Sequence, residues 1–498
     1  VFAPELDIAA FGGDPDNFNF PRWSFDMSFL RAYENGKPAV TPAHLRFDWS
    51  GAEVNEPVFV SGHPGSTSRQ LTSAELDAQR DAYLPFWLIR YSELRGRMLQ
   101  FAKTGEEAAR ITVQPINLYE NAIKVRRKQL DALQDDALFD RHRASEARLE
   151  AAMRADPDLA PSARAFADIA AAQQVFRDIV VRHTFLEGSA GFNSVLFDHA
   201  RTLVRAAVER GKPNAERLRA YSDARLPAIE QALRGAAPVY PDLEKLKLSF
   251  SLERMREWLG PDDPVVKQVF GRDDPDTLAS RLVDGSRLAD PAVRMALFTG
   301  GQAAVAASDD PMIRLAALVE ADSRALYQRM EEEVDGPTVR ARDAIAAARF
   351  KALGTSVYPD ATFTLRFTYG SVTGWTEQGQ PVTPFTSVGR MFERATGRDP
   401  FRLPENWLAV AHELDMDTPL NFTSTVDITG GNSGSPIVDA RGDIVGLAFD
   451  GNIHSISGDY WYDAAKNRAI GVDVRAIRLA LDKVYRAQAL LAEMDGAR

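Results

Sequence analysis

Cysteine is absent from the 498 residues of this chain. Disulfides, thiol nucleophiles and thiolate metal sites are therefore excluded, although a chain without cysteine fits the cytosol as well as the periplasm. No stretch approaches the roughly 20 apolar residues of a membrane helix, so we expect no membrane span. Positive charge is in deficit, because 59 Lys and Arg stand against 70 Asp and Glu. The net charge of −11 argues against a nucleic-acid partner.

Metal-binding signatures are also missing. The sequence contains no HExxH string, and its carboxylate clusters lack the spacing of an EF-hand loop. We therefore expect neither a metal nor another cofactor.

The length of the chain predicts two or three domains, because one hydrophobic core rarely serves so many residues. Residues 1–75 are rich in turn formers and short β-prone runs such as "EPVFVSGHPGS". Residues 76–353 carry apolar side chains at the three-and-four spacing of helices, broken by Asp–Pro and Gly–Pro pairs. Strand patterns return in residues 354–498. We expect a large helical lid inserted between two β-rich parts.

Local patterns sharpen this outline. In "ATFTLRFTYGSVTGW" (361–375), Phe363, Leu365 and Phe367 alternate with polar residues, as in a strand, and "GDIVGLAFDGN" and "RAIGVDV" predict two more strands. The stretch "RAIRLALDKVYRAQALLAEM" predicts a closing helix. The first residues, "VFAPELDIAAFGGDPDN", resemble the inside of a strand and carry no initiator Met or signal-like core. We therefore expect a longer precursor or a lost N-terminal segment.

The string Gly431-Asn432-Ser433-Gly434-Ser435-Pro436 predicts the nucleophile loop of a serine peptidase. Its glycines allow a sharp turn that brings N–H groups close to a substrate carbonyl. The amides of Gly431 and Ser433 would then form the oxyanion hole. The competing interpretation is a Gly/Ser-rich turn without chemistry, and the hairpin expected after the loop disfavours it. The pattern is not an α/β-hydrolase elbow, because no helix is expected after Ser433.

Five strings along the chain resemble the bacterial dipeptidyl-peptidases of the 7 and 11 type: "FGGDPDNFNFPRWSFDMSFLRAYENGKP" (11–38), "VFVSGHPGST" (58–67), "PINLYENAIK" (115–124), "YPDATFTLRFTYGSVTGW" (358–375) and "TGGNSGSPIVDARGDIVGLAFDGN" (429–452). The resemblance implies a chymotrypsin-like double β-barrel with an inserted all-helical domain. Residues 1–75 would be the remainder of an incomplete first barrel, 76–353 the lid, and 354–498 the second barrel with a C-terminal helix. A homodimer in the periplasm, secreted or at the cell surface of a Gram-negative bacterium, is also implied.

The resemblance assigns catalytic roles residue by residue. Ser433 matches the nucleophile, and Asp26 matches the triad aspartate that orients the histidine and stabilises its imidazolium. An oligopeptide is therefore the expected partner and substrate.

The same resemblance assigns a binding site for the substrate's free α-amine. Asn17, Asp450 and Asn117 match the groups that hold the amine, and Phe18 stands beside them where the family often has Trp. A buried ammonium needs a carboxylate and other oxygen acceptors. An amine anchor two residues from the scissile bond would measure out a dipeptide.

The expected catalytic histidine is not evident. In the family the base precedes the aspartate, but no histidine precedes Asp26. His63 follows Asp26, in a string whose family counterpart is structural, and His454 follows Ser433 and the pocket strand. The other histidines are His44, His142, His183, His199 and His412. We therefore expect the triad histidine upstream of residue 1.

Three functions are compatible with these patterns. The first is a serine dipeptidyl-peptidase that releases N-terminal dipeptides. The second is a pseudo-peptidase that lacks the base and binds peptide N-termini without cutting them. The third is a trypsin-like endopeptidase, which would use neither an amine anchor nor a long helical lid.

Gly451 predicts the residue preference of the pocket. It follows Asp450, and in the acid-specific branch of the family the matching position is Arg, which pairs with a substrate carboxylate. A glycine leaves the pocket deeper and uncharged. We expect cleavage after large hydrophobic residues.

Overall fold

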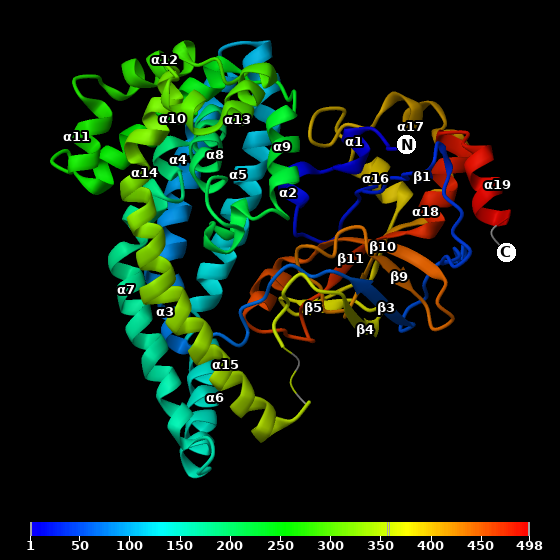
Figure 1. Ribbon diagram of the computed structural model, residues 1–498. Helices are drawn as coiled ribbons and strands as arrows, with labels where there is room; N and C mark the ends of the chain where they lie inside the picture. The colour runs from blue at the N-terminus through cyan, green and yellow to red at the C-terminus, as the bar shows by residue number, and fades with distance from the viewer. Residues whose placement is uncertain (1, 356, 358, 497–498) are drawn as a thin grey trace. The chain divides into compact units, whose positions relative to one another are not determined.

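The computed structural model describes residues 2–355, 357 and 359–496, which fall into two compact units (Figure 1). The β unit consists of Val1–Leu71, Arg127–Leu138 and Ser356–Arg498. The helical unit consists of Thr72–Arg126 and Phe139–Thr355. The helical unit thus interrupts the β unit in the sequence, and the short stretch 127–138 within this interruption belongs to the β unit.

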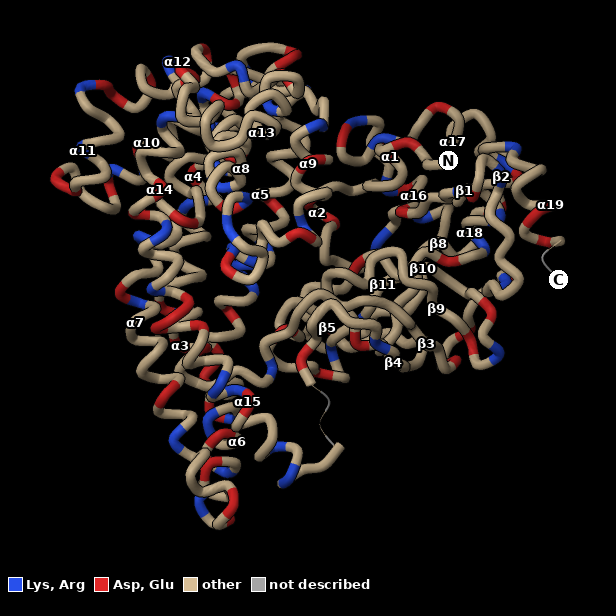
Figure 2. Tube along the Cα trace, viewed as in Figure 1, with Lys and Arg blue, Asp and Glu red and all other residues tan. Residues whose placement is uncertain are grey.

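The helical unit is formed by α3 (Ser73–Ala78), α4 (Leu84–Ala102), most of α5 (Glu106–Leu133), α6 (Asp136–Ala155), α7 (Ala165–Leu186), α8 (Val195–Glu209), α9 (Leu226–Arg234), α10 (Pro241–Leu259), α11 (Pro264–Phe270), α12 (Pro275–Gly285), α13 (Pro291–Ala306), α14 (Pro311–Arg329) and α15 (Gly336–Leu353). Charged residues of both signs are spread along these helices, as expected for solvated faces (Figure 2).

Four consecutive helices, α11 to α14, begin with the same Asp–Pro pair. The side chains of Asp263, Asp274, Asp290 and Asp310 accept hydrogen bonds from backbone N–H groups of the first turn. The proline that follows each one needs no hydrogen-bond partner and has a backbone angle suited to a helix. The Asp–Pro breaks in the sequence are therefore helix starts.

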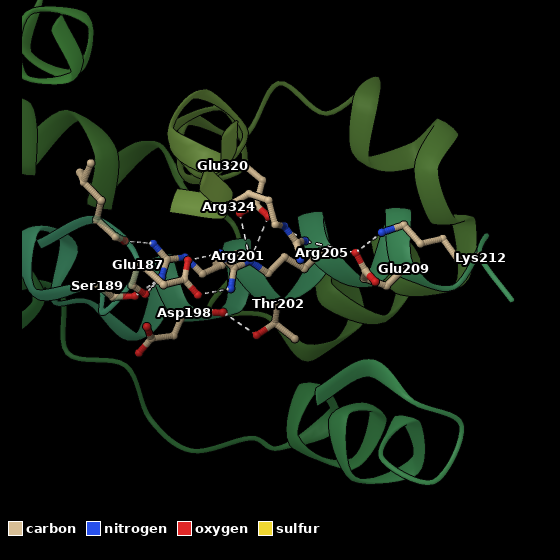
Figure 3. Close-up of polar contacts among 11 residues, drawn as sticks. Glu187, Ser189, Asp198, Arg201, Thr202, Arg205, Glu209, Lys212, Glu320 and Arg324 are labelled. Carbon is tan, nitrogen blue, oxygen red and sulfur yellow. Dashed lines mark hydrogen bonds and ion pairs between the residues drawn. The ribbon is translucent and has the colours of Figure 1, made fainter. Parts of the chain in front are cut away.

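An ion-pair network joins the residue that caps α7 to α8 and α14 inside the helical unit (Figure 3). Arg205 of α8 donates to both carboxylate oxygens of Glu187, at 2.9 and 2.6 Å, and to those of Glu320, at 3.1 and 3.0 Å. Arg324 bridges Glu320 and Glu209 at 3.2 Å each. These partly buried charges are mutually paired, so removing one of them leaves another without a counter-charge.

The β unit contains β1 (Tyr33–Glu34), β2 (Lys37–Pro38), β3 (Pro57–Gly62), β4 (Arg366–Ser371), β5 (Trp375–Glu377), β6 (Gln380–Val382), β7 (Phe385–Ser387), β8 (Pro419–Ser424), β9 (Pro436–Val438), β10 (Ile444–Gly451) and β11 (Ala469–Asp473). Seven of them form one antiparallel sheet in the order β4-β3-β9-β10-β11-β8-β7. A bridge between Val372 and Ser424 joins the end of β4 to β8, so the sheet curls back on itself.

Strand β3 comes from the first part of the chain but lies inside this sheet, between β4 and β9 (Figure 1). The sequence assigns residues 1–75 and 354–498 to separate barrels. Strand β3 shares its sheet with six strands of the second stretch, whereas β1 and β2 pair with each other in a separate sheet, and the double barrel stays a prediction. A core of small and branched side chains, including Val58, Val60, Ile437 and Val445, holds the sheet together.

Both ends of the chain differ from the sequence prediction. Residues 2–17 are not the inside of a strand, because Phe2 forms only an isolated bridge with Phe29 and two short helices follow, α1 (Leu6–Ala9) and α2 (Gly13–Asp16). The single closing helix is broken into α18 (Val474–Leu479), a π-helical turn and α19 (Gln488–Gly496). Two further short helices are α16 (Val388–Arg394) and α17 (Glu405–Ala409).

The apolar residues that alternate in 361–375 lie on an exposed face. Strand β4 begins at Arg366, and Phe363, Leu365, Phe367 and Tyr369 are each between 65 and 74% exposed. The alternation therefore marks the strand only in part, because Phe363 and Leu365 precede it, and it does not mark a buried side. Among the described residues, no helix has the length and apolar character to cross a membrane.

Candidate active site

The Ser433 loop is held by hydrogen bonds at both ends. Asn432 accepts from the Thr429 N–H through its buried side chain at 3.1 Å, and its own N–H donates to the Thr429 carbonyl at 3.1 Å. The Gly434 N–H donates to the carbonyl of Ala448 at 2.7 Å, and Ala448 returns a bond to Ser435 at 2.9 Å. Strand β9 follows at once, so the predicted hairpin is confirmed. Ser433 is solvent-exposed on this fixed loop.

Gly431 allows the loop to approach a second segment closely. Its φ of +106° is unfavourable for any residue with a side chain, and a Cβ there would stand 2.5 Å from the His63 carbonyl oxygen and 2.8 Å from the Gly65 nitrogen. The Gly65 N–H also donates to the Gly430 carbonyl at 2.7 Å. The segment around His63 thus supports the loop through its backbone, while the exposed His63 ring lies 5.9 Å from that of Phe363.

Two backbone N–H groups predicted for the oxyanion hole are not used elsewhere. The neighbouring N–H groups of Asn432, Gly434 and Ser435 all donate within the loop or to β10. In the described part of the chain, the N–H groups of Gly431 and Ser433 have no such acceptor, and both residues are exposed. Unpaired donors beside an exposed serine can stabilise negative charge on a bound carbonyl oxygen.

Asp450 lies near the end of β10, two residues beyond the strand position that holds the Ser433 loop. Its side chain is only 7% exposed. The Phe18 N–H donates to Oδ2 at 3.1 Å, the Gly451 N–H donates to Oδ1 at 2.8 Å, and Arg22 Nη1 lies 3.2 Å from Oδ2. Burial raises the pKa of this carboxyl, while Arg22 and the two amides oppose the rise.

Phe18 reaches Asp450 through an unusual backbone conformation. Its φ is +58°, in the left-handed region that bulky residues rarely adopt. This conformation follows α2 and its C-cap Asn17 and accompanies the N–H bond to Asp450. Strained backbone of this kind is concentrated at functional sites. The backbone of Phe18 therefore meets Asp450, with Asn17 next to Phe18 in the chain, and their role in one binding site stays a prediction.

Asp26 lies on the segment that carries Arg22. Neighbouring protein atoms displace enough water to raise the pKa of its carboxyl, although part of the residue reaches solvent, and the positive charge of Arg22 opposes the rise. Asp26 also raises the pKa of Asp450, so the two carboxylates interact. The segment is fixed to β8 by reciprocal bonds of 2.9 Å between the Ser24 backbone and the Asn421 side chain.

Arg22 is the residue that the sequence interpretation missed. Its guanidinium pairs with Asp450, and its Nε donates to Ser24 Oγ at 2.7 Å. The only signal in the sequence is one cationic residue within the aromatic string "FNFPRW".

Gly451 faces Ser455, which the sequence interpretation also missed. A Cβ at Gly451 would overlap Ser455 Oγ and stand 2.8 Å from Ser455 Cβ. The Ser455 hydroxyl donates to the Asn452 carbonyl at 2.6 Å. The space that a side chain at position 451 would need is therefore filled by a small polar side chain.

A hairpin of β5 and β6 flanks this strand end. Glu377 accepts from Trp375 Nε1 at 2.8 Å and pairs with His454 Nε2 at 2.6 Å. The hydrogen bond from Trp375, followed by that with His454, lowers the pKa of Glu377. The ring of Trp375 lies 5.9 Å from that of Phe20. His454 is thus engaged with the hairpin.

The remaining predictions concern Asn117 and the histidine. Asn117 lies on an exposed face of α5 in the helical unit, and its contact with the amine stays a prediction. Among the described residues, no histidine side chain forms a hydrogen bond or ion pair with Ser433 or Asp26. The same residues contain no group of three or more side chains that could hold a metal ion.

A family comparison fits this geometry. The model of the family described as Peptidase S46 matches residues 1–496. The chain belongs to the peptidase S46 family.

Relatives of this S46 chain are named dipeptidyl-peptidases. It is 28% identical to the Asp/Glu-specific dipeptidyl-peptidase of Shewanella putrefaciens, over 100% of this chain and 74% of the relative. It is 25% identical to dipeptidyl-peptidase 7 of Phocaeicola vulgatus, over 99% of this chain and 71% of the relative. The crystal structure of Porphyromonas endodontalis DPP11 in complex with the dipeptide Arg-Glu shares the fold, with a TM-score of 0.79 and 22% identity over 99% of this chain and 74% of that one.

Proposed function

We propose that this S46 chain belongs to a serine dipeptidyl-peptidase that releases N-terminal dipeptides from oligopeptides. The observation that carries the proposal is the buried Asp450 carboxylate on the strand whose Ala448 holds the Ser433 loop. A carboxylate at that position can pair with a peptide's α-ammonium close to the serine. The names of the relatives support the same reaction class.

In the proposed reaction, Ser433 Oγ attacks the second peptide carbonyl of the bound substrate. The N–H groups of Gly431 and Ser433 donate to the oxyanion that forms. A histidine takes the proton of Ser433 and later delivers it to the leaving amine, while Asp26 orients that histidine and stabilises its imidazolium. The identity of this histidine stays a prediction, because no histidine among the described residues pairs with Ser433 or Asp26.

Substrate length follows from the amine anchor. Asp450 provides the negative charge, and Phe18 donates its N–H to it, with Asn17 next to Phe18 in the chain. Removing a largely desolvated carboxylate that pairs with a bound cation weakens the binding free energy by on the order of 2–5 kcal/mol. Internal peptide segments have no ammonium to offer, which disfavours endopeptidase activity. Homodimerisation and a periplasmic, secreted or cell-surface location remain predictions from the family resemblance.

We further propose that a large hydrophobic residue precedes the scissile bond. Gly451 offers no charge, and Ser455 is the side chain beside it. The backbone carbonyl of Arg468 also faces Gly451. Its guanidinium donates hydrogen bonds to backbone carbonyls such as those of Thr373 and Gly374. The names of the relatives do not decide between a hydrophobic and an acidic preference, because they include both Asp/Glu-specific enzymes and dipeptidyl-peptidase 7.

A peptide-cleavage assay tests the reaction. The full-length protein is incubated with a hexapeptide bearing a free amine and with its N-acetylated twin, and the products are identified by mass spectrometry. We expect successive loss of dipeptides from the free peptide only, and loss of this activity in the Asp450→Ala variant. Efficient cleavage of the acetylated peptide would refute the proposal.

The second candidate is a pseudo-peptidase that binds peptide N-termini without cutting them. This candidate is favoured because no histidine among the described residues pairs with Ser433 or Asp26. Dipeptide binding by a full-length protein that cleaves neither peptide would support it over the enzyme.

A further inference from the structure

The contacts of Arg22 extend beyond its pairing with Asp450. The two side chains are 8 and 7% exposed, and Nη1 lies 3.2 Å from Oδ2. Arg22 also donates to Ser24 Oγ at 2.7 Å and to the carbonyl of Asp16, and its guanidinium lies 5.7 Å from the ring centre of Phe449. The guanidinium is therefore held by several groups besides Asp450, and a partner fixed in this way keeps one orientation.

The hydrogen bonds to Asp450 from the described residues leave one acceptor position of its carboxylate free. A carboxylate accepts about four hydrogen bonds over its two oxygens. In the described structure, Arg22 and the Phe18 N–H approach Oδ2, and the Gly451 N–H approaches Oδ1. One acceptor position on Oδ1 therefore remains for an incoming N–H group.

The charged groups around Asp450 do not balance within the described residues, and one negative charge is left without a partner. The charged groups that act on its carboxyl in the described residues are Arg22 and Asp26. Two carboxylates against one guanidinium carry one surplus negative charge, which one ammonium would neutralise. Without Arg22, the buried Asp450 carboxylate would face the negative charge of Asp26 with no counter-charge, which favours its protonation. A protonated Asp450 could no longer pair with an ammonium.

We infer that Arg22 is a positioning residue, which keeps Asp450 ionised and oriented so that its free acceptor position receives a peptide's α-ammonium. This inference rests on the proposed function of Asp450 as the amine anchor. Arg22 acts on the substrate only through Asp450.

Titration calorimetry over a pH series separates this role from a merely structural one. The probe is the dipeptide Ala-Leu, with N-acetyl-Ala-Leu as its blocked twin, and pH runs from about 4 to 8. The protein is the full 498-residue chain, as wild type and as the variants Arg22→Lys, Arg22→Gln and Arg402→Gln. Arg402 is a half-exposed arginine that pairs with Asp7 in the same unit, and it serves as the matched control.

For the wild type we expect binding of the free dipeptide only, with affinity lost as the pH falls and Asp450 becomes protonated. Arg22→Gln should move the pH midpoint of binding upward by about one unit or more, because an opposite charge at this distance lowers a carboxyl pKa by about 1–3 units. At pH values below the wild-type midpoint, this shift weakens binding about tenfold or more. Arg22→Lys should retain the midpoint, and Arg402→Gln should change neither quantity.

The outcomes distinguish the two proposals. Equal binding of free and blocked dipeptide by the wild type would refute the amine anchor. Amine-dependent binding with an unmoved midpoint in Arg22→Gln would leave the anchor intact and refute the role of Arg22. Should the glutamine variant not fold, as judged by circular dichroism, Ser24→Ala provides the second test, because it removes the 2.7 Å bond that fixes the guanidinium. Wild-type affinity at every pH in Ser24→Ala would also overturn the inference.

Discussion

Replacing Gly451 by arginine should not by itself change the substrate preference from hydrophobic to acidic residues. A Cβ at position 451 would overlap the hydroxyl of Ser455 and stand 2.8 Å from its Cβ, whereas carbon atoms normally approach to about 3.5–4.0 Å. Ser455 would have to turn and lose its 2.6 Å bond to the Asn452 carbonyl.

The magnitude follows from these two contacts. Loss of one hydrogen bond costs about 1 kcal/mol, and overpacking costs about 1–3 kcal/mol. We expect Gly451→Arg to lower the free energy of unfolding by about 2–4 kcal/mol. The double variant Gly451→Arg/Ser455→Gly removes the obstructing side chain and should recover most of that loss.

Dipeptide binding reports the change in preference. The wild type should bind Ala-Leu more tightly than Ala-Glu by about 1.5–3 kcal/mol, or about 10- to 150-fold, from burial of the leucine side chain. The double variant should reverse this order, because its guanidinium can pair with the glutamate carboxylate. Urea unfolding and calorimetry measure the two effects. A single variant as stable as the wild type, or a wild type that binds Ala-Glu equally well, would refute this description of the pocket.

Three further predictions concern catalysis and stability. Ser433→Ala should remove dipeptide release by several orders of magnitude in the full-length protein yet leave calorimetric binding of a free dipeptide unchanged; substantial residual release would exclude Ser433 as the nucleophile. Arg205→Met should lower the free energy of unfolding in urea by about 3 kcal/mol, because the partly buried Glu187 carboxylate loses its ion-pair partner and Glu320 keeps only Arg324. The exposed-site control Arg164→Met should cost under about 0.5 kcal/mol, and equal losses would contradict this account. Burial and the nearby charge of Arg294 lower the pKa of His199 from 6.5 to about 4, so the unfolded chain binds more protons between these values and stability is lost as the pH falls through that window. His199→Gln should flatten this part of a plot of thermal midpoint against pH, while the exposed-site variant His412→Gln should follow the wild type; a parallel curve for His199→Gln would show that other groups cause the acid loss.

The sequence determined those features that depend on neighbouring residues. The glycines around Ser433 fix a tight loop, because only glycine tolerates the backbone angle at Gly431 beside another backbone. The three-and-four spacing and the Asp–Pro pairs mark the helices of the insertion, since helix formation and capping are local. The placement of Asp450 and Gly451 at the end of a strand also followed from a short apolar run.

Only the tertiary structure decided which distant residues meet. Arg22 pairs with Asp450 across most of the chain, and nothing in either local pattern specifies that contact. Strand β3 joins a sheet formed mainly by the C-terminal part, because backbone hydrogen bonding between strands does not depend on their separation in sequence. The charge state and orientation of the proposed amine anchor arise from these long-range contacts, since burial and charge act through space.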